Sequence, residues 1–253
     1  MNKDYLFITG GTGKIGNALV KHFCTLGYSV CFTSTSQEKA IALQEEVAVT
    51  GAPQPVYVIS DFSKENAAEE LVKELTDKSI LISQIIHNAR SLHYLKTEDH
   101  FLVSEENFMN EFRVNVVVPY RLTMELVLNK HPLKQVIFIS SMYGVVAPSP
   151  RLYDHFESSS VIHYGVTKAA QIHLTKELAV RLAENNIHVN CISLGGIEGR
   201  TNDDFKKRYA QLNPLREMLK ESDFIAPIEF MVQHPDIKMT GHNLIVDGGW
   251  SIW

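Results

Sequence analysis

The sequence predicts an α/β fold, a doubly wound parallel sheet of about seven strands with helices on both faces. Strand-like apolar runs alternate with helical patterns along the whole chain. Several of these runs are almost continuously hydrophobic, which is typical of strands that are covered on both faces. No internal repeat, low-complexity tract or linker interrupts the alternation. We therefore expect a single domain over residues 1–253.

Each expected strand is short and apolar, and a helical pattern separates most of them from the next. In chain order they are Tyr5–Thr9, Ser29–Thr33, Pro55–Ser60, Gln84–His87, Gln135–Ser140, Ile187–Ser193 and Asn243–Val246. The two strongest helical patterns repeat an apolar residue every four positions, from Phe108 to Leu128 and from Val166 to Leu182. Pro119 interrupts the first pattern, where we expect a kink. Ligands of such sheets bind beyond the carboxyl ends of the strands, so site residues should follow each strand.

Composition narrows the classes of protein that the chain can represent. It is 45% hydrophobic, and its formal charge of −5 comes from interspersed acids and bases, with no basic run to bind nucleic acid. We expect no membrane partner, because no apolar run approaches the length of a membrane span. Cys24, Cys31 and Cys191 lack paired spacing and are interpreted as free thiols of a cytoplasmic protein. The histidines show no metal-binding spacing, so no metal site is expected.

A glycine-rich turn follows the first strand. Gly10, Gly13 and Gly16 recur at three-residue intervals, and a helical pattern begins at once. Glycines permit a tight turn and a close approach to a pyrophosphate, and the helix N-terminus offers free N–H groups. A turn without a ligand is the alternative interpretation. The turn predicts a Rossmann-type cofactor site that comprises Gly10, Gly11, Thr12, Gly13, Lys14, Ile15 and Gly16.

Polar residues also follow the next three strands. The second strand lacks the carboxylate that an NAD site often places on the ribose, and Ser34 and Thr35 follow instead. This favours NADP(H) over NAD(H), although a serine here can equally cap a helix. Asp61, which precedes Phe62, either accepts from an adenine amino group or caps the next helix. Asn88-Ala89 allows the chain to pass close to a ribose.

A tyrosine and a lysine, Tyr164 and Lys168, are spaced to share one face of a helix. A nearby ammonium favours the phenolate, so such a tyrosine can exchange a proton with a carbonyl or hydroxyl oxygen. The pair alone is not specific. Ser141, at the end of the fifth strand, and Asn115, in the preceding helix, complete a candidate proton relay.

With these residues the chain resembles the short-chain dehydrogenase/reductase family over nearly its full length. The matching motifs are Thr9-Gly10-(x)2-Gly13-(x)2-Gly16, Asp61, Asn88-Ala89, Asn115, Ser140-Ser141-(x)2-Gly144, Tyr164-(x)3-Lys168, Asn190-(x)-Ile192-Ser193-(x)-Gly195-Gly196-Ile197 and Val246-Asp247-Gly248-Gly249. The resemblance implies an NAD(P)(H)-dependent enzyme that interconverts a carbonyl and a secondary alcohol. It implies the catalytic residues Asn115, Ser141, Tyr164 and Lys168.

In this resemblance Tyr164 is the acid–base and Ser141 polarises the substrate carbonyl. Ser141 is preferred to Ser140 because it precedes Gly144 by three positions. Lys168 holds the nicotinamide ribose, and Asn115 positions a water. The resemblance also adds Tyr164, Lys168, Gly195, Ile197 and Thr201 to the expected cofactor contacts.

The chain departs from the family pattern at Lys14, Arg90 and Leu194. These departures leave open a non-catalytic nucleotide-binding regulatory module. The glycine spacing is similar to that of larger nucleotide-sugar-modifying members, which leaves open an epimerase or dehydratase, although the chain is short for one. The family also implies a homotetramer or a homodimer.

The substrate is suggested by two segments. Residues 145–163 separate Ser141 from Tyr164 by more than the family's usual spacing and should border the pocket, and residues 197–222 should form a mobile lid. The candidate substrate residues are Arg90, Tyr143, Arg151, Tyr153 and His155, which suit a polar or anionic molecule. With this polar loop, the "SMYGVVAP" at residues 141–148 and the "VDGGWSIW" at residues 246–253, the chain resembles oxidoreductases of surface-polysaccharide and nonulosonic-acid (flagellin-modification) sugar pathways.

The alternative substrate is an acyl chain on a carrier protein. The "TSTS" after the second strand resembles 3-oxoacyl-carrier-protein reductases. An acidic carrier needs a basic patch, for which Lys206, Lys207 and Arg208 are the candidates.

Overall fold

The computed structural model describes residues 4–199 and 201–253, and a seven-stranded parallel sheet runs through them. The strand order is β3-β2-β1-β4-β5-β6-β7. The strands are β1 (Asp4–Ile8), β2 (Val30–Ser34), β3 (Val56–Ile59), β4 (Leu81–His87), β5 (Gln135–Ser141), β6 (His188–Leu194) and β7 (Asn243–Val246). The predicted fold class is confirmed.

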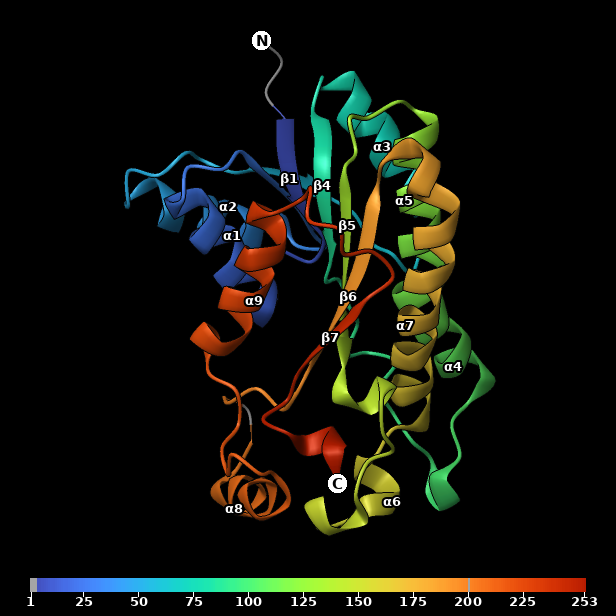
Figure 1. Cartoon of the computed structure of the whole chain (residues 1–253). Helices are drawn as coiled ribbons and strands as arrows, with labels where there is room; N and C mark the ends of the chain where they lie inside the picture. The colour runs from blue at the N-terminus through green and yellow to red at the C-terminus, as the bar shows by residue number, and fades with distance from the viewer. Residues whose placement is uncertain (1–3, 200) are drawn as a thin grey trace.

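Helices cover both faces of the sheet (Figure 1). One face carries α1 (Lys14–Thr25), α2 (Gln37–Ala48) and α9 (Glu221–Gln233). The other carries α3 (Ala67–Asp77), α5 (Val118–Leu128) and α7 (Ile162–Leu182), with α4 (Glu105–Phe112) beside α7. Alternate residues of each strand enter opposite cores, so Phe7 packs under one layer while Leu6 and Ile8 pack under the other. This two-sided burial explains the continuous apolar runs.

The predicted helix from Phe108 to Leu128 is a rod of three parts: α4, a π-helical turn η2 (Arg113–Val117) and α5. Pro119 lies in the first turn of α5. A proline has no N–H, so it cannot bond to the carbonyl four residues earlier, which here belongs to Asn115. A widened π turn therefore stands where a kink was expected, and it contains a candidate relay residue.

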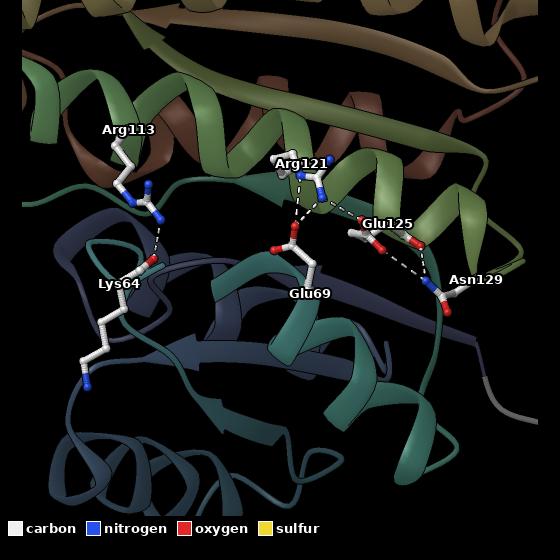
Figure 2. Close-up of polar contacts among 6 residues, drawn as sticks. All are labelled: Lys64, Glu69, Arg113, Arg121, Glu125 and Asn129. Atoms are coloured by element: carbon white, nitrogen blue, oxygen red, sulfur yellow. Dashed lines mark hydrogen bonds and ion pairs between the residues drawn. The ribbon is translucent and has the colours of Figure 1, made fainter. Parts of the chain in front are cut away.

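Polar contacts orient this rod on the neighbouring helix (Figure 2). Arg121 of α5 donates to Glu69 of α3 at 3.0 Å and pairs with Glu125 one turn away. Arg113, inside the π turn, donates to the carbonyl oxygen of Lys64 at 2.6 Å. The ion pairs of Arg121 are exposed and contribute little to stability, so they connect α5 to α3 without adding much to the free energy of unfolding.

The segments beyond the carboxyl ends of the strands gather at one edge of the sheet. There α8 (Asp203–Leu212) and the short α6 (Phe156–Ser159) lie near the C-terminus (Figure 1). A small core of Met142, Leu152, Tyr209, Met218 and Trp250 holds this edge together. The rings of Tyr209 and Trp250 stack at 4.7 Å, which docks α8 on the C-terminal turn. None of the helices in the described ranges is both long and apolar enough to cross a bilayer.

Candidate active site

A cavity of about 1100 Å³ opens at the carboxyl edge of the sheet. Its walls come from the glycine turn, from the loops after β2 to β6 and from the start of α7. Thr35 and Lys39 line it near the end of β2, whereas Ser141 and Tyr164 line it near the end of β5. The connections leave β1 and β4 toward opposite faces, so the cavity lies at the switch point of the sheet.

The glycine turn forms a main-chain cradle. Gly10 has a φ of +68°, its N–H donates to the Thr33 hydroxyl at 2.9 Å, and a Cβ there would lie 2.8 Å from the Cα of Ala89. A Cβ on Gly16 would collide with the carbonyl oxygen of Gly10. The side-chain amide of Asn88 donates to that same oxygen at 3.2 Å. The free N–H groups at the start of α1 meet the cavity here, so the residues present fit a dinucleotide pyrophosphate.

Most of the predicted cofactor residues line the cavity. They are Gly10, Thr12, Gly13, Lys14, Ile15, Ser34, Thr35, Asp61, Phe62, Asn88, Ala89, Tyr164, Gly195, Ile197 and Thr201. Gly11, Gly16 and Lys168 are not among its lining residues. Gly11 packs on the ring of Phe32, where a Cβ would collide, so its role is to keep the turn against β2.

Two lysines lie at different ends of the cofactor region. Lys14 begins α1, and its Nζ packs against Gly199 after β6, on the side away from β2. Lys39 is exposed on the first turn of α2 and lines the cavity beside Thr35. The sequence interpretation missed Lys39, although Ser36 as the helix cap places it three residues into α2.

Three of the polar side chains near the ends of β2 and β3, Ser34, Ser36 and Asp61, already have hydrogen-bond partners within the fold. Ser34 is buried, and its Oγ bonds to both Thr12 Oγ1 and the main chain of Ser36. Ser36 accepts from the N–H of Lys39 and caps α2. One oxygen of Asp61 accepts from the N–H and the hydroxyl of Ser63. Thr35 and Lys39 therefore offer freer groups to a ligand than Ser34 does.

The two serines at the end of β5 differ. Ser140 Oγ donates to the carbonyl oxygen of Lys168 at 2.8 Å. Ser141 Oγ accepts from the N–H of Tyr143 at 3.2 Å, and its proton is uncommitted. Gly144 lies so close to α7 that a Cβ would be 2.7 Å from the carbonyl carbon of Lys168. This contact brings the end of β5 against the helix that carries Tyr164.

Tyr164 lines the cavity, and two cations lie near its ring. The guanidinium carbon of Arg90 is 5.4 Å from the centre of its ring, and Lys168 Nζ is 5.8 Å away. Lys168 is only 5% exposed. Burial lowers the pKa of Lys168 to about 8, the positive charge of Arg90 acts in the same direction, and Glu111 opposes both.

Asn115 is fully buried behind this pair. Its side-chain amide donates to Glu111 Oε1 at 2.6 Å and to Thr167 Oγ1 at 3.1 Å. The main-chain carbonyl oxygen of Asn115 accepts a hydrogen bond from Gln171 Nε2 at 2.7 Å. Burial raises the pKa of the Glu111 carboxyl, and the bond from Asn115 opposes the shift. Glu111 and Gln171 were missed by the sequence interpretation, because an isolated polar residue in a helical pattern carries no sign of where it is buried.

The substrate residues separate into two groups. Arg90, Tyr143 and Tyr153 line the cavity, and the two tyrosine hydroxyls bond at 2.7 Å. Arg151 and His155 are exposed and do not line it, so that expectation is corrected. The reason is local: the turn at Pro150–Leu152 buries Leu152 completely and directs its neighbours outward.

Sequence and structure comparisons agree on the family. The profile of the enoyl-(acyl carrier protein) reductase family matches residues 12–251. The chain is 26% identical to a 3-oxoacyl-[acyl-carrier-protein] reductase of Chlamydia pneumoniae, over 96% of this chain and 95% of the relative. It is 23% identical to the post-translational flagellin modification protein A of Campylobacter coli, over 100% of both chains.

A solved structure extends this likeness to three dimensions. A short chain dehydrogenase from Leptospira borgpetersenii with bound NAD+ superposes with a TM-score of 0.83 and 27% identity, over 99% of this chain and 94% of that one. Three observations therefore support one family. They are the family profile, this superposition, and the arrangement of Ser141, Tyr164 and Lys168 at one edge of the sheet. The chain therefore belongs to the short-chain dehydrogenase/reductase family and is an oxidoreductase that acts on CH–OH groups.

Proposed function

We propose that this enzyme uses NADP(H) in preference to NAD(H) to interconvert a carbonyl and a secondary alcohol on a polar, anionic or sugar-like substrate. The observation that carries the proposal is one continuous cavity with two distinct ends. Ser141 and Tyr164 lie at one end, and Thr35 and Lys39 lie at the other.

The residues at the first end have separate tasks. Tyr164 gives its hydroxyl proton to the substrate oxygen during reduction and takes it back during oxidation. Ser141 donates its free hydroxyl proton to the same oxygen, and the N–H of Tyr143 holds its Oγ in place. Lys168 keeps a positive charge near the phenol. The bound nicotinamide supplies or accepts the hydride.

The cofactor preference is supported by the charges near β2. A 2′-phosphate adds negative charge, and the exposed ammonium of Lys39 lines this end of the cavity with the hydroxyl of Thr35. The carboxylate here is Asp61, one oxygen of which is bonded to Ser63. Paired titrations with NADPH and NADH test the proposal, which predicts tighter binding of NADPH. Tighter binding of NADH would refute it.

The substrate class is supported by Arg90. Its guanidinium lies over the face of Tyr164, beside the reacting position, and no carboxylate among the described residues lies within 4.0 Å of it. The paired hydroxyls of Tyr143 and Tyr153 add further polar groups. A panel of hydroxy acids, sugar acids and neutral alcohols, followed by nicotinamide absorbance, tests this. We expect turnover with the anionic or sugar-like members.

A carrier-bound acyl substrate has less support. The predicted basic patch on α8 is neutralised, because Lys207 pairs with Asp204 at 3.3 Å and Arg208 pairs with Asp154 at 2.7 Å. The 3-oxoacyl-carrier-protein reductase activity of a relative at 26% identity keeps this alternative in the panel. Faster turnover of an acetoacetyl thioester than of any hydroxy acid would favour it.

We also propose that the chain works in the cytoplasm as a single catalytic domain within a homotetramer or homodimer. Apolar side chains stay exposed on α5 and α7, among them Leu128 and Val180, and at the C-terminal Trp253. Where such side chains join into a contiguous patch they mark contact surfaces between proteins, and we propose that α5, α7 and the C-terminus form these contacts. Light scattering after gel filtration tests the assembly, and a monomer at micromolar concentration would contradict it.

A further inference from the structure

Gln171 connects two elements of the candidate relay. It lies on α7 one turn after Lys168 and is only 2% exposed. Its Oε1 accepts from Lys168 Nζ at 3.0 Å, and its Nε2 donates to the carbonyl oxygen of Asn115 at 2.7 Å. An amide has one acceptor end and one donor end, so this bridge holds in a single orientation only.

The local helix geometry makes the carbonyl of Asn115 available. Pro119 has no N–H to donate to it, and the π turn at Arg113–Val117 surrounds it. A buried carbonyl without a partner costs free energy, and the Gln171 amide supplies that partner from another helix. The bridge thus replaces the backbone hydrogen bond that the carbonyl of Asn115 lacks. The side chain of the same residue is held by Glu111.

The buried ammonium of Lys168 is held by neutral acceptors. Two of its three protons go to Ile139 O at 2.8 Å and to Gln171 Oε1. No carboxylate in the described ranges lies within 4.0 Å of it. The charged and titratable groups that face it are Tyr164 on α7, Arg90 after β4, Glu111 on α4 and Cys191 on β6. Its third proton has no acceptor among the described residues, and the centre of the Tyr164 ring lies 5.8 Å from Nζ.

We propose that Gln171 is a positioning residue, which fixes the ammonium of Lys168 beside Tyr164 by bridging it to the main-chain carbonyl of Asn115. The inference rests on the proposed function, because it assigns a task to Lys168 within that site. Lys168 and Gln171 are both buried, so this contact is shielded from solvent and holds the ammonium in one place.

Two substitutions at Gln171 separate this role from packing. Gln171→Met keeps the length of the side chain and removes both bonds. Gln171→Glu keeps an acceptor for Lys168 and adds a negative charge beside it. The matched control is Thr175→Val, one turn further along α7, which removes a buried bond to the carbonyl oxygen of Gln171 and leaves Lys168 untouched.

The direct readout is an NMR titration of the Lys168 side chain in cofactor-free protein. The wild-type lysine should titrate near the pKa of about 8 that its burial sets. Gln171→Met removes a hydrogen-bond acceptor from the charged form of Lys168, so the pKa of Lys168 should fall by about one unit. Gln171→Glu should raise the pKa of Lys168. Thr175→Val should leave it unchanged. Wild-type titration in both Gln171 variants would overturn the inference.

Kinetics supply the second readout. With a substrate from the panel, Gln171→Met should lower kcat by about tenfold and move the alkaline decline of carbonyl reduction to lower pH, because the ammonium is lost earlier. Gln171→Glu should move that decline to higher pH. A melting temperature that falls with an unchanged pH profile would mean that Gln171 is structural only. A wild type without any turnover would refute the proposed function, while the NMR titration still decides on the bridge.

Discussion

Ser140 and Ser141 are adjacent at the end of β5, and their hydroxyls have different partners. Ser140 donates to the carbonyl of Lys168 at 2.8 Å, whereas Ser141 accepts from Tyr143 and keeps its proton free at the cavity. We expect Ser141→Ala to lower kcat by about 10² to 10³, the usual cost of losing one donor to a developing oxyanion.

The neighbouring substitution is the matched control. Ser140→Ala removes one buried hydrogen bond and should cost about 1 kcal/mol of stability. Its kcat should fall less than that of Ser141→Ala. Steady-state kinetics and thermal melting of both variants make the comparison. The reverse order of the two kcat values would show that the roles of the serines have been exchanged.

Arg90 should favour anionic substrates over neutral ones through its positive charge. Arg90→Gln removes the cation above the Tyr164 ring, and loss of a charge-assisted hydrogen bond should lower kcat/KM for anionic substrates by about 10- to 100-fold. Neutral alcohols should lose much less, and Arg90→Lys should retain part of the preference. Equal losses for anionic and neutral substrates would mean that Arg90 serves only to pack against the phenol.

Lys39 and Lys14 should respond differently to the 2′-phosphate. Lys39→Ala should weaken NADPH by about tenfold and leave NADH nearly unchanged, because the side chain lines the β2 end of the cavity. Lys14→Ala should weaken both cofactors to a similar degree, because its Nζ lies against Gly199 after β6. Isothermal calorimetry with both nucleotides measures this. A selective loss of NADPH in Lys14→Ala would exchange the two assignments.

The buried Lys168 should leave a pH signature in stability. Between pH 8 and 10.5 the folded lysine is neutral while the unfolded chain still binds the proton, so the free energy of unfolding rises with pH. Lys168 should contribute a rise of about 3 kcal/mol over this window, and Lys168→Met should lack it. Denaturant unfolding of both proteins without cofactor measures the difference. A constant difference across the window would contradict the burial of a titrating lysine.

Local patterns explain how much the sequence could predict. Buried parallel strands are continuous apolar runs, and the glycine turn and the Tyr164–Lys168 spacing each lie within a few residues. The fold prediction is accordingly confirmed, with every strand within three residues of its expected bounds. The substrate residues were harder, because the burial of Leu152 decides that Arg151 and His155 point outward.

The remaining site residues depend on contacts between distant segments. Gln171 meets Asn115 across 56 positions of sequence, and no periodicity signals such a pair. Glu111 looks like an ordinary helix carboxylate, yet the π turn and α7 enclose it completely. The position of Lys39 at the cavity follows from the start of α2 at Gln37, which the sequence alone did not define. The roles of the relay residues themselves stay predictions.

Tyr164 is proposed to transfer the proton in a nicotinamide-dependent reaction. Tyr164→Phe removes a single oxygen atom at the cavity and leaves the ring under Arg90 in place. The most direct measurement pairs turnover of this variant with its NADPH dissociation constant. We predict that kcat falls by at least about 10³ while the dissociation constant changes less than about threefold. Substantial residual turnover in a folded, cofactor-binding variant would contradict the account.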